Sequence, residues 1–271
     1  MKFTKMHGLG NDYLYFYGEV PENVRELAVR LSDRHFGAGS DGLIFISRSD
    51  TADFRMRIFN ADGSEAMMCG NGIRCVGKYV YDKGYIDRKM LTVETLSGIR
   101  TLELHTQGGT VKTVTVGMGK ALVGEEKRLT VWGKEFTYLP VSIGNPHAVF
   151  FTDHVEEVPL SEVGPRIEHH PDYPDGVNVE FVERLSDNRL RMRVWERGSG
   201  ITMACGTGAS ASAAVAVRKG YADTGQPVRV ILDGGPLEII VNHEGFVTMQ
   251  GPAETVYEAE IPDEEYRRTG K

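Results

Sequence analysis

Two stretches of this 271-residue chain decide how it folds: CGNGIRCVGKYVYD at residues 69–82 and CGTGASASAAVAVR at residues 205–218. Both begin with Cys-Gly-x-Gly, and they are separated by 136 residues (205 − 69 = 136). The same offset relates RMRIFN at 55–60 to RMRVWE at 191–196, and KGY at 83–85 to KGY at 219–221. Three matches in one register indicate an internal duplication, which changes how every motif is interpreted.

The duplication predicts two related halves, residues 1–118 and 119–271, with the last residues packing back on the first half. Gly, Asp and Asn turn signals separate short β-rich runs. One such run, residues 43–46, falls opposite Val179-Glu180-Phe181-Val182. A helix is expected after each cysteine, ending at Gly84 and at Gly220. Small residues at 209–217 favour a helix enclosed by closely approaching sheet. We therefore predict an α+β fold of two pseudo-symmetric domains, each a mixed β-sheet or barrel curled around a central helix.

The amino-acid composition excludes several classes of function. Hydrophobic residues make up 41% of the chain and charged residues 25%, which is ordinary for a globular enzyme, and no apolar run is long enough for a membrane span. The net charge of −7, without a basic stripe, argues against nucleic acid as a partner. No secretory leader is evident at the first residues, so we expect a cytoplasmic protein. The histidines and cysteines lack metal-ligand spacing, so we expect no metal.

Three cysteines cannot form a disulfide framework, and two of them are better explained by chemistry. Cys69 and Cys205 each precede a helix, where unpaired N–H groups and the helix dipole favour a thiolate. The glycines that follow would let a substrate carboxylate approach the backbone. If the halves face each other across a pseudo-twofold axis, one thiolate and one thiol can exchange protons on opposite faces of a carbon, without a cofactor. The alternative is that both are buried, inert thiols. Cys75, inside the first helix, is expected to pack in the core.

Several segments of the chain resemble those of the diaminopimelate epimerase family. They are Met6-His7-Gly8-Leu9-Gly10-Asn11-Asp12, the segment from Phe59 to Cys75, Gly144-Asn145-Pro146-His147, Val177-Asn178-Val179, and Trp195-Glu196-Arg197-Gly198 followed by Cys205-Gly206-Thr207-Gly208. They occur in the family's order and span nearly the whole chain. The resemblance implies epimerisation of L,L-2,6-diaminopimelate to the meso form without pyridoxal phosphate or metal, in lysine and peptidoglycan precursor synthesis. We also expect a homodimer.

The resemblance also assigns the site. Cys69 and Cys205 are expected to be catalytic, and the substrate-binding candidates are Asn11, Asn60, Gly70, Asn71, Asn145, Asn178, Glu196, Arg197, Gly206 and Thr207, with His147 as a further candidate. Diaminopimelate carries an ammonium and a carboxylate at each end, so amides and an adjacent Glu-Arg pair suit it. Against this, Glu196 and Arg197 could be an exposed pair, the asparagines could serve turns, and His147 could cap a loop. Gly42 stands where some family members have Gln.

Three other functions fit parts of the sequence. Gly206 to Ala211 satisfies Gly-x-Gly-x-x-Ala, as in dinucleotide-dependent oxidoreductases. That motif directly follows a strand, however, and here residues 196–204 intervene. Asp233 also lies 27 residues after Gly206 (233 − 206 = 27), whereas the acidic residue of the motif lies about 20 residues on. A non-catalytic amino-acid-binding module would leave the cysteines unexplained. Hydroxyproline epimerases and proline racemases resemble this layout but generally carry His after the first Cys-Gly, where this chain has Asn71.

Overall fold

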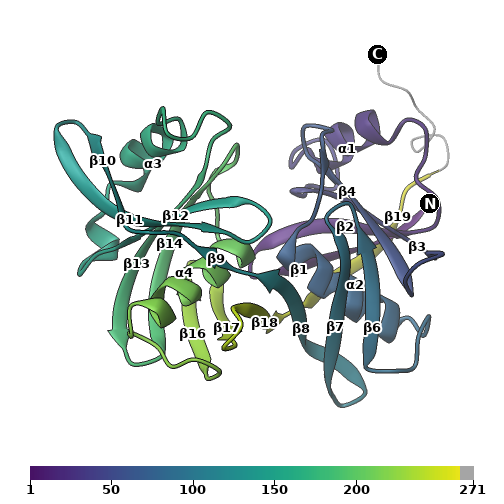
Figure 1. The fold of residues 1–271 in the computed structure, drawn as a ribbon. Coiled ribbons are helices and arrows are strands. Elements are labelled where there is room, and N and C mark those ends of the chain that lie inside the picture. Colours follow the sequence, from purple (N-terminus) through teal and green to yellow (C-terminus); the bar gives the residue numbers. More distant parts are fainter. Residues whose placement is uncertain (263–271) are drawn as a thin grey trace. The chain divides into compact units, whose positions relative to one another are not determined.

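A computed structural model describes residues 1–262 (Figure 1). The chain divides into two compact units by its internal contacts. The first comprises Met1–Val116 together with the segment from Gly251, and the second comprises Gly117–Gln250. Each unit contains a mixed β-sheet and two α-helices, so the predicted α+β class is confirmed. The division into halves at residues 118 and 119 remains a proposal about the duplication.

The first unit is built on one continuous run of paired strands. Its elements are β1 (Lys2–Gly8), β2 (Asn11–Tyr17), α1 (Val24–Ser32), β3 (Gly42–Ser47), β4 (Phe54–Asn60), β5 (Glu65–Ala66), α2 (Gly70–Asp82), β6 (Met90–Thr95), β7 (Gly98–Gln107), β8 (Thr110–Lys120) and β19 (Glu254–Glu260). β1 pairs antiparallel with both β2 and β19. β2 pairs parallel with β3, β3 antiparallel with β4, and β4 parallel with β6. β6, β7 and β8 then form an antiparallel meander.

The second unit repeats this pattern. Its elements are β9 (Leu122–Val123), β10 (Lys127–Val131), β11 (Lys134–Ser142), β12 (Pro146–Phe151), η1 (Val155–Glu157), α3 (Leu160–Glu168), β13 (Asn178–Ser186), β14 (Arg189–Glu196), β15 (Gly200–Ile201), α4 (Gly206–Arg218), β16 (Pro227–Leu232), β17 (Gly235–Val241) and β18 (Phe246–Pro252). β12 pairs parallel with β13, β13 antiparallel with β14, and β14 parallel with β16. β16, β17 and β18 form the closing meander. The two units thus share one strand order.

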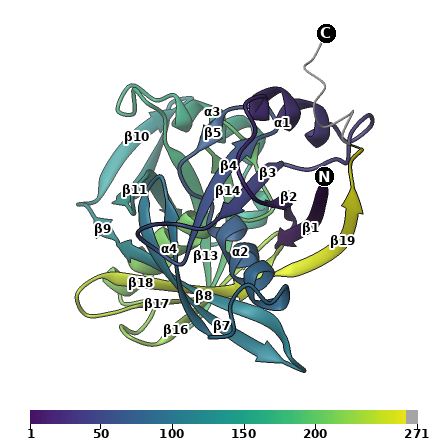
Figure 2. The ribbon, with the colours of Figure 1, turned by 90° about the vertical axis from the view of Figure 1, so that its right-hand side faces the viewer.

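The central helices of the two units, α2 and α4, begin and end alike. Cys69 and Cys205 are their N-cap residues, with extended backbone. At the other end, Gly84 and Gly220 adopt φ angles of +74° and +71°, a conformation that glycine accepts without strain. In Figures 1 and 2, α2 lies among β1, β2 and β7, and it contacts all three strands. The helix boundaries predicted from the cysteines and glycines are confirmed.

Burial of the helices follows from their small residues. A methyl group added at Gly77 of α2 would come within 2.8 Å of Leu104 Cδ2, so the β7 strand approaches the helix backbone directly. In α4 the hydroxyls of Ser210 and Ser212 donate to the carbonyls of Gly206 and Gly208, each at 2.8 Å, which satisfies them inside the core. Both helices can therefore present their first turns from a rigid, enclosed position.

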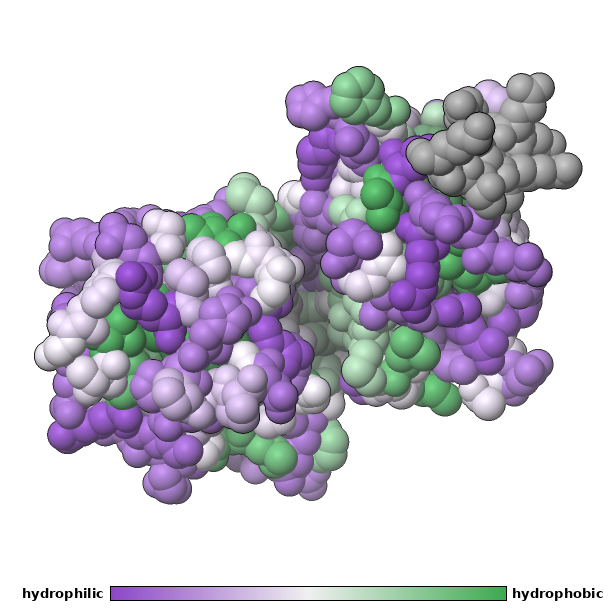
Figure 3. Space-filling model, turned by 90° about the horizontal axis from the view of Figure 1, so that it is seen from above, coloured by the Kyte–Doolittle hydropathy of each residue, from purple (hydrophilic) through white to green (hydrophobic). Residues whose placement is uncertain are grey.

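The remaining helices, α1 and α3, each cover an apolar cluster of their own unit. Leu27 and Ala28 of α1 pack with Phe16 and Phe45, whose rings stack at a centroid distance of 5.0 Å. Within residues 1–262 we find no helix that combines the length and apolar character needed to cross a membrane. The face seen in Figure 3 is mainly hydrophilic, with apolar residues in small separate patches.

Candidate active site

Cys69 lies at the start of α2, where its sulfur makes two hydrogen bonds. The N–H of Gly72 donates to Sγ at 3.3 Å, as expected for a helix cap. On the other side, Sγ donates to Oδ1 of Asn11 at 3.2 Å. Asn11 is the first residue of β2, so a strand end and a helix start meet at the thiol. The structure thus brings together Cys69, Asn11 and the first helical turn, which holds Gly70 and Asn71.

The orientation of the Asn11 amide is fixed by Asp41, which is not among the site residues predicted from the sequence. Nδ2 of Asn11 donates to Oδ2 of Asp41 at 2.7 Å, which leaves Oδ1 directed at the thiol. Asp41 is in turn held by Arg34, with 2.8 Å between Oδ1 and Nη2. Tyr13 is also buried beside this group, and burial raises the pKa of its phenol well above the ordinary value. In the sequence, only the position of Asp41 next to Gly42 could have indicated that it belongs to the site.

Cys205 has a more enclosed and more acidic setting. Its side chain is 5% exposed, and Sγ accepts the N–H of Gly208 at 3.4 Å. Oγ1 of Thr207 lies 3.5 Å from Sγ. The side chains of Glu196 and Glu180 face the same sulfur closely enough to act on its ionisation.

The protonation expected for a cysteine at a helix start is wrong for Cys205. Burial raises the pKa of this thiol well above its ordinary value, and the negative charges of Glu196 and Glu180 add to the effect. The Thr207 hydroxyl and the Gly208 N–H favour the thiolate but do not outweigh these two causes. These causes favour the protonated thiol at Cys205. The effect of Glu180 could not be predicted from the sequence, because this residue lies 25 residues from Cys205 along the chain (205 − 180 = 25).

Glu196 and Arg197, adjacent in sequence, separate in space. Glu196 ends β14 and accepts a hydrogen bond from the Thr202 hydroxyl. Burial raises the pKa of its carboxyl, opposed by hydrogen bonds from Thr202 and Cys205. Arg197 begins the following turn, where it is exposed and Nη1 donates to the Asp175 carbonyl at 3.2 Å. Glu196 thus lies beside Thr202 and Cys205, whereas the side chain of Arg197 lies in the adjoining turn.

His147 is part of the interior, not the loop cap considered as an alternative. It lies in β12 and is 1% exposed. Nδ1 is 2.6 Å from Oε1 of Glu180, and Nε2 is 3.0 Å from Oδ1 of Asn145. Nδ2 of Asn145 donates to Oγ1 of Thr207 at 3.4 Å. Glu180, absent from the expected site residues, was visible only as the one charged residue in the run Val179-Glu180-Phe181-Val182.

Two of the other asparagines serve local structure. Asn178 is 4% exposed: Nδ2 donates to the Pro146 carbonyl at 2.9 Å and Oδ1 accepts the N–H of Arg197 at 3.0 Å. It therefore braces the turn that carries Arg197. Asn60 ends β4, where Nδ2 donates to Oγ of Ser64 at 3.0 Å.

Two further residues are accounted for by packing. Cys75 is fully buried, as expected. At Gly42 a side-chain carbon would come within 2.2 Å of the Phe59 carbonyl oxygen, so the backbone here leaves no space for Gln.

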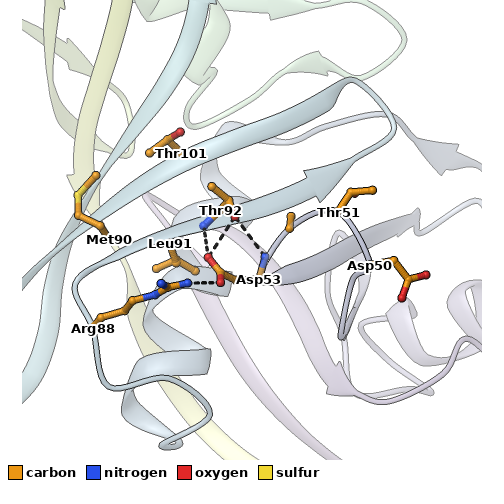
Figure 4. A pocket seen from close by; sticks show the side chains of 9 residues that line it. Asp50, Thr51, Asp53, Arg88, Met90, Leu91, Thr92 and Thr101 are labelled. Atoms are coloured by element: carbon orange, nitrogen blue, oxygen red, sulfur yellow. Dashed lines mark hydrogen bonds and ion pairs between the residues drawn. The ribbon is translucent and has the colours of Figure 1, made fainter.

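A surface depression in the first unit lies apart from these residues. It is lined by Asp50, Thr51, Ala52, Asp53, Arg88, Met90, Leu91, Thr92 and Thr101. Figure 4 shows that its central carboxylate, Asp53, already points at Arg88 and at the N–H and hydroxyl of Thr92. None of the expected site residues lines it. Among the described residues, no group of three or more His, Cys, Asp or Glu side chains is placed to hold a metal ion.

Comparison with known proteins adds to this geometry. The family model described as "Diaminopimelate epimerase" matches residues 3–123 and 139–256. Proteins of that name from Phocaeicola vulgatus and Acetivibrio thermocellus are 51% and 48% identical to the chain, and each alignment covers 96% of the chain and 98% of the relative.

Solved structures share the fold at low identity. A hydroxyproline epimerase from Agrobacterium vitis with bound trans-4-hydroxy-L-proline has a TM-score of 0.72 at 18% identity, covering 96% of this chain and 91% of that one. A PhzF-family phenazine biosynthesis protein from Bacillus anthracis has a TM-score of 0.73 at 16% identity, covering 97% and 99%. At such identities the likeness extends to the fold alone.

Proposed function

We propose that Cys69 and Cys205 are the two proton-transfer groups of this chain, which belongs to the diaminopimelate epimerase family. The chain is accordingly an isomerase that epimerises diaminopimelate, a reaction of lysine biosynthesis. The observation that carries the assignment of the cysteines is their repetition. In two units of one topology, a thiol caps the central helix and accepts the N–H of the third residue on.

Inversion at an α-carbon requires one base and one acid. In the proposed reaction the thiolate of one cysteine takes the α-proton of L,L-diaminopimelate, and the thiol of the other returns a proton to the opposite face, which gives the meso form. The roles reverse in the other direction. The raised pKa of Cys205 supports a thiol there when the site is at rest. The reaction requires both sulfurs to reach the same carbon.

The proton is hard to remove because charge develops on the substrate carboxylate. We assign the stabilisation of that charge to the N–H groups of the first helical turns, at Gly70, Asn71, Gly206 and Thr207. Gly70 and Gly206 have no side chain of their own to stand between their amides and a carboxylate. Acid–base exchange between two thiols needs neither pyridoxal phosphate nor a metal.

The remaining candidates are proposed to hold the rest of the substrate. They are Asn11, Asn60, Asn145, His147, Asn178, Glu196 and Arg197. Glu196 suits an ammonium group, because a cation would restore the ionised form that burial disfavours. Arg197 is exposed and suits the distal carboxylate as a planar, two-pronged donor. Asn178, whose amide is already used by Pro146 and Arg197, is proposed to act by holding Arg197 in place.

A single isotope experiment tests the reaction. Purified protein, treated with a chelator and given no cofactor, is incubated with L,L-diaminopimelate in deuterated water. We expect the meso isomer with deuterium at the inverted carbon. Absence of exchange until a metal ion or pyridoxal phosphate is added would contradict the two-thiol mechanism.

The cellular setting also belongs to the proposal. We propose a cytoplasmic homodimer that supplies peptidoglycan precursors as well as lysine. The three cysteines are free thiols in the structure, which is compatible with a reducing compartment. Sedimentation of the purified chain measures the oligomeric state.

A further inference from the structure

Glu180 is a buried carboxylate at a place where the first unit has an apolar side chain. The duplication offset puts it opposite Ile44 (180 − 136 = 44), and both side chains are 0% exposed. The three-dimensional environments agree. A carbon added at Gly72 would lie 2.8 Å from Cδ1 of Ile44, and one added at Gly208 would lie 2.7 Å from Oε1 of Glu180. The second unit has therefore placed a charge beside its catalytic helix.

The partner of Glu180 differs between the units as well. In the first unit Leu14 pairs with Leu43, the residue before Ile44. In the second, Ala148 pairs with Val179, the residue before Glu180. The residues preceding Leu14 and Ala148 are Tyr13 and His147, so these two correspond. A Tyr–Ile arrangement near Cys69 is thus replaced by a His–Glu pair near Cys205.

Burial of the His147–Glu180 pair lowers the stability of the fold, which suggests that the pair has a functional role. Both side chains are fully buried, and Oε2 of Glu180 has no hydrogen-bond partner among the described residues. Burying a carboxylate with one unsatisfied oxygen destabilises a fold, and a short contact to an imidazole offsets only part of that cost. The first unit has Tyr13 and Ile44 at the corresponding places, so this topology does not require a buried charged pair there.

The pair stands at one end of a row of hydrogen bonds that ends at the catalytic sulfur. The successive contacts are Glu180 Oε1 to His147 Nδ1 at 2.6 Å, His147 Nε2 to Asn145 Oδ1 at 3.0 Å, Asn145 Nδ2 to Thr207 Oγ1 at 3.4 Å, and Thr207 Oγ1 to Cys205 Sγ at 3.5 Å. We call this row the Glu180 chain.

The direction of donation in the Glu180 chain follows from the acceptor atoms that His147 faces. An ionised Glu180 can only accept, so His147 donates to it from Nδ1. Oδ1 of Asn145 also only accepts, so Nε2 donates to it, and Asn145 presents its NH₂ group to Thr207. The hydroxyl of Thr207 then accepts that bond and is free to donate its own proton to Cys205.

We propose that Glu180 is a positioning residue, which orients His147, Asn145 and Thr207 so that the Thr207 hydroxyl donates to Cys205. This inference rests on the proposed function, because it matters when Cys205 has given up its proton and lies as a thiolate beside Glu196. A donated O–H then stabilises the sulfur against the negative charges of Glu196 and Glu180, which disfavour the thiolate. The substrate needs no contact with Glu180 for this effect.

Two variants separate charge from packing. Glu180→Gln keeps the shape of the side chain, but its amide can both donate and accept, so it no longer determines the direction of the hydrogen bonds in the Glu180 chain. Glu180→Ile installs the side chain that the first unit uses at the same place. Ile44→Val, in the first unit, is the matched control, because it disturbs the corresponding packing and leaves the Glu180 chain intact.

The first measurement is nitrogen-15 NMR of the His147 ring. In the wild-type protein we expect a hydrogen on each ring nitrogen, because each faces an acceptor oxygen, and in Glu180→Ile a changed signal at Nδ1, which loses its acceptor. A wild-type ring with an unprotonated Nε2 would overturn the proposal, because Asn145 would then face Thr207 with its oxygen.

The second measurement is the alkylation rate of each cysteine, read by mass spectrometry of its peptide, with Cys69 as the internal reference. Removal of the Glu180 charge by itself favours the Cys205 thiolate, so the hydrogen bond is isolated with Thr207→Val. This substitution should slow Cys205 by about three- to tenfold in the otherwise wild-type protein and leave its rate unchanged in the Glu180→Ile background. Cys69 should be unaffected, and Ile44→Val should leave Cys205 unchanged. An equal slowing by Thr207→Val in both backgrounds would overturn the proposal.

Catalysis supplies the third measurement. We expect kcat to fall at least tenfold in Glu180→Ile with little change in KM, and Glu180→Asp to recover part of the loss. A fall in thermal stability with normal kcat would show that Glu180 is merely structural. NMR and alkylation require no turnover, so they test the Glu180 chain even if the cysteines proved not to be the proton-transfer groups, whereas the isotope experiment tests that assignment separately.

Discussion

Gly208→Ala and Gly72→Ala are chemically identical substitutions at corresponding places, and the structure predicts opposite results. At Gly208 the new methyl carbon would lie 2.7 Å from Oε1 of Glu180 and 3.3 Å from the sulfur of Cys205. At Gly72 it would lie 2.8 Å from Cδ1 of Ile44 and 3.1 Å from Cε of Met56. The ends of these two apolar side chains can move aside, whereas Glu180 is fixed by His147.

The magnitude follows from two opposing effects. Replacing Gly by Ala inside a helix stabilises it by roughly 1 kcal/mol. Displacing Glu180 loses a hydrogen bond to a charged group, which is worth roughly 1.5 to 3 kcal/mol. Gly208→Ala should therefore lower the free energy of unfolding by roughly 0.5 to 2 kcal/mol, a few degrees in Tm. Gly72→Ala should stay within roughly 0.5 kcal/mol of the wild type or exceed it.

Urea unfolding of the full-length variants measures the difference, and epimerase assays accompany it. We expect Gly208→Ala to lose most of its activity as well, because the same methyl group displaces Cys205. If Gly208→Ala were as stable and as active as the wild type, the close approach of Glu180 to α4 would be refuted. The same conclusion would follow if Gly72→Ala were the more damaged protein.

Three further predictions concern the cysteines and Arg197. Cys69→Ser and Cys205→Ser should each abolish epimerisation, yet each should still eliminate a leaving group placed beside the reacting carbon, from one stereoisomer only; equal elimination from both isomers would favour a single base. Arg197→Lys should severely impair diaminopimelate use, because a point charge does not replace a planar donor, and near-normal kinetics would place Arg197 outside the site. Burial raises the pKa of Cys75 from 9.0 to about 11, so the stability that its protonated form contributes is present below pH 9.0 and is lost as the pH rises through about 11. Urea midpoints of Cys75→Ala should accordingly fall less steeply over that interval than those of the wild type, with epimerase activity retained; parallel slopes would contradict this.

The fold was largely predictable because its signals are local and occur twice. A cysteine followed by Gly-x-Gly marks the start of each central helix, and Gly84 and Gly220 mark the ends. Repetition at one offset then related strands that are distant in sequence. The last residues were expected to pack back on the first half, but nothing in residues 254–260 identified β1 as the strand with which they pair.

The electrostatics of the site were not predictable in the same way. The helix start suggested an ionised Cys205, but the carboxylates of Glu180 and Glu196 and the depth of burial reverse that expectation. These groups come from β13 and β14, and only the folded sheet brings them to the thiol. Asp41 presents the same problem, because its effect on Cys69 passes through the amide of Asn11.

The pairing of β1 with β19 has a consequence for how the protein is made. On the ribosome, β1 is synthesised before the second unit, Gly117–Gln250, and its partner β19 is synthesised after it. One edge of the first unit's sheet therefore stays unpaired until residues 254–260 have been made, whereas the second unit is continuous in sequence and can close as soon as it emerges. Newly made protein should therefore become protease-resistant from the middle of its sequence outward. The main-chain bond from the Ile261 N–H to the Met1 carbonyl, 2.8 Å long, is among the last to form.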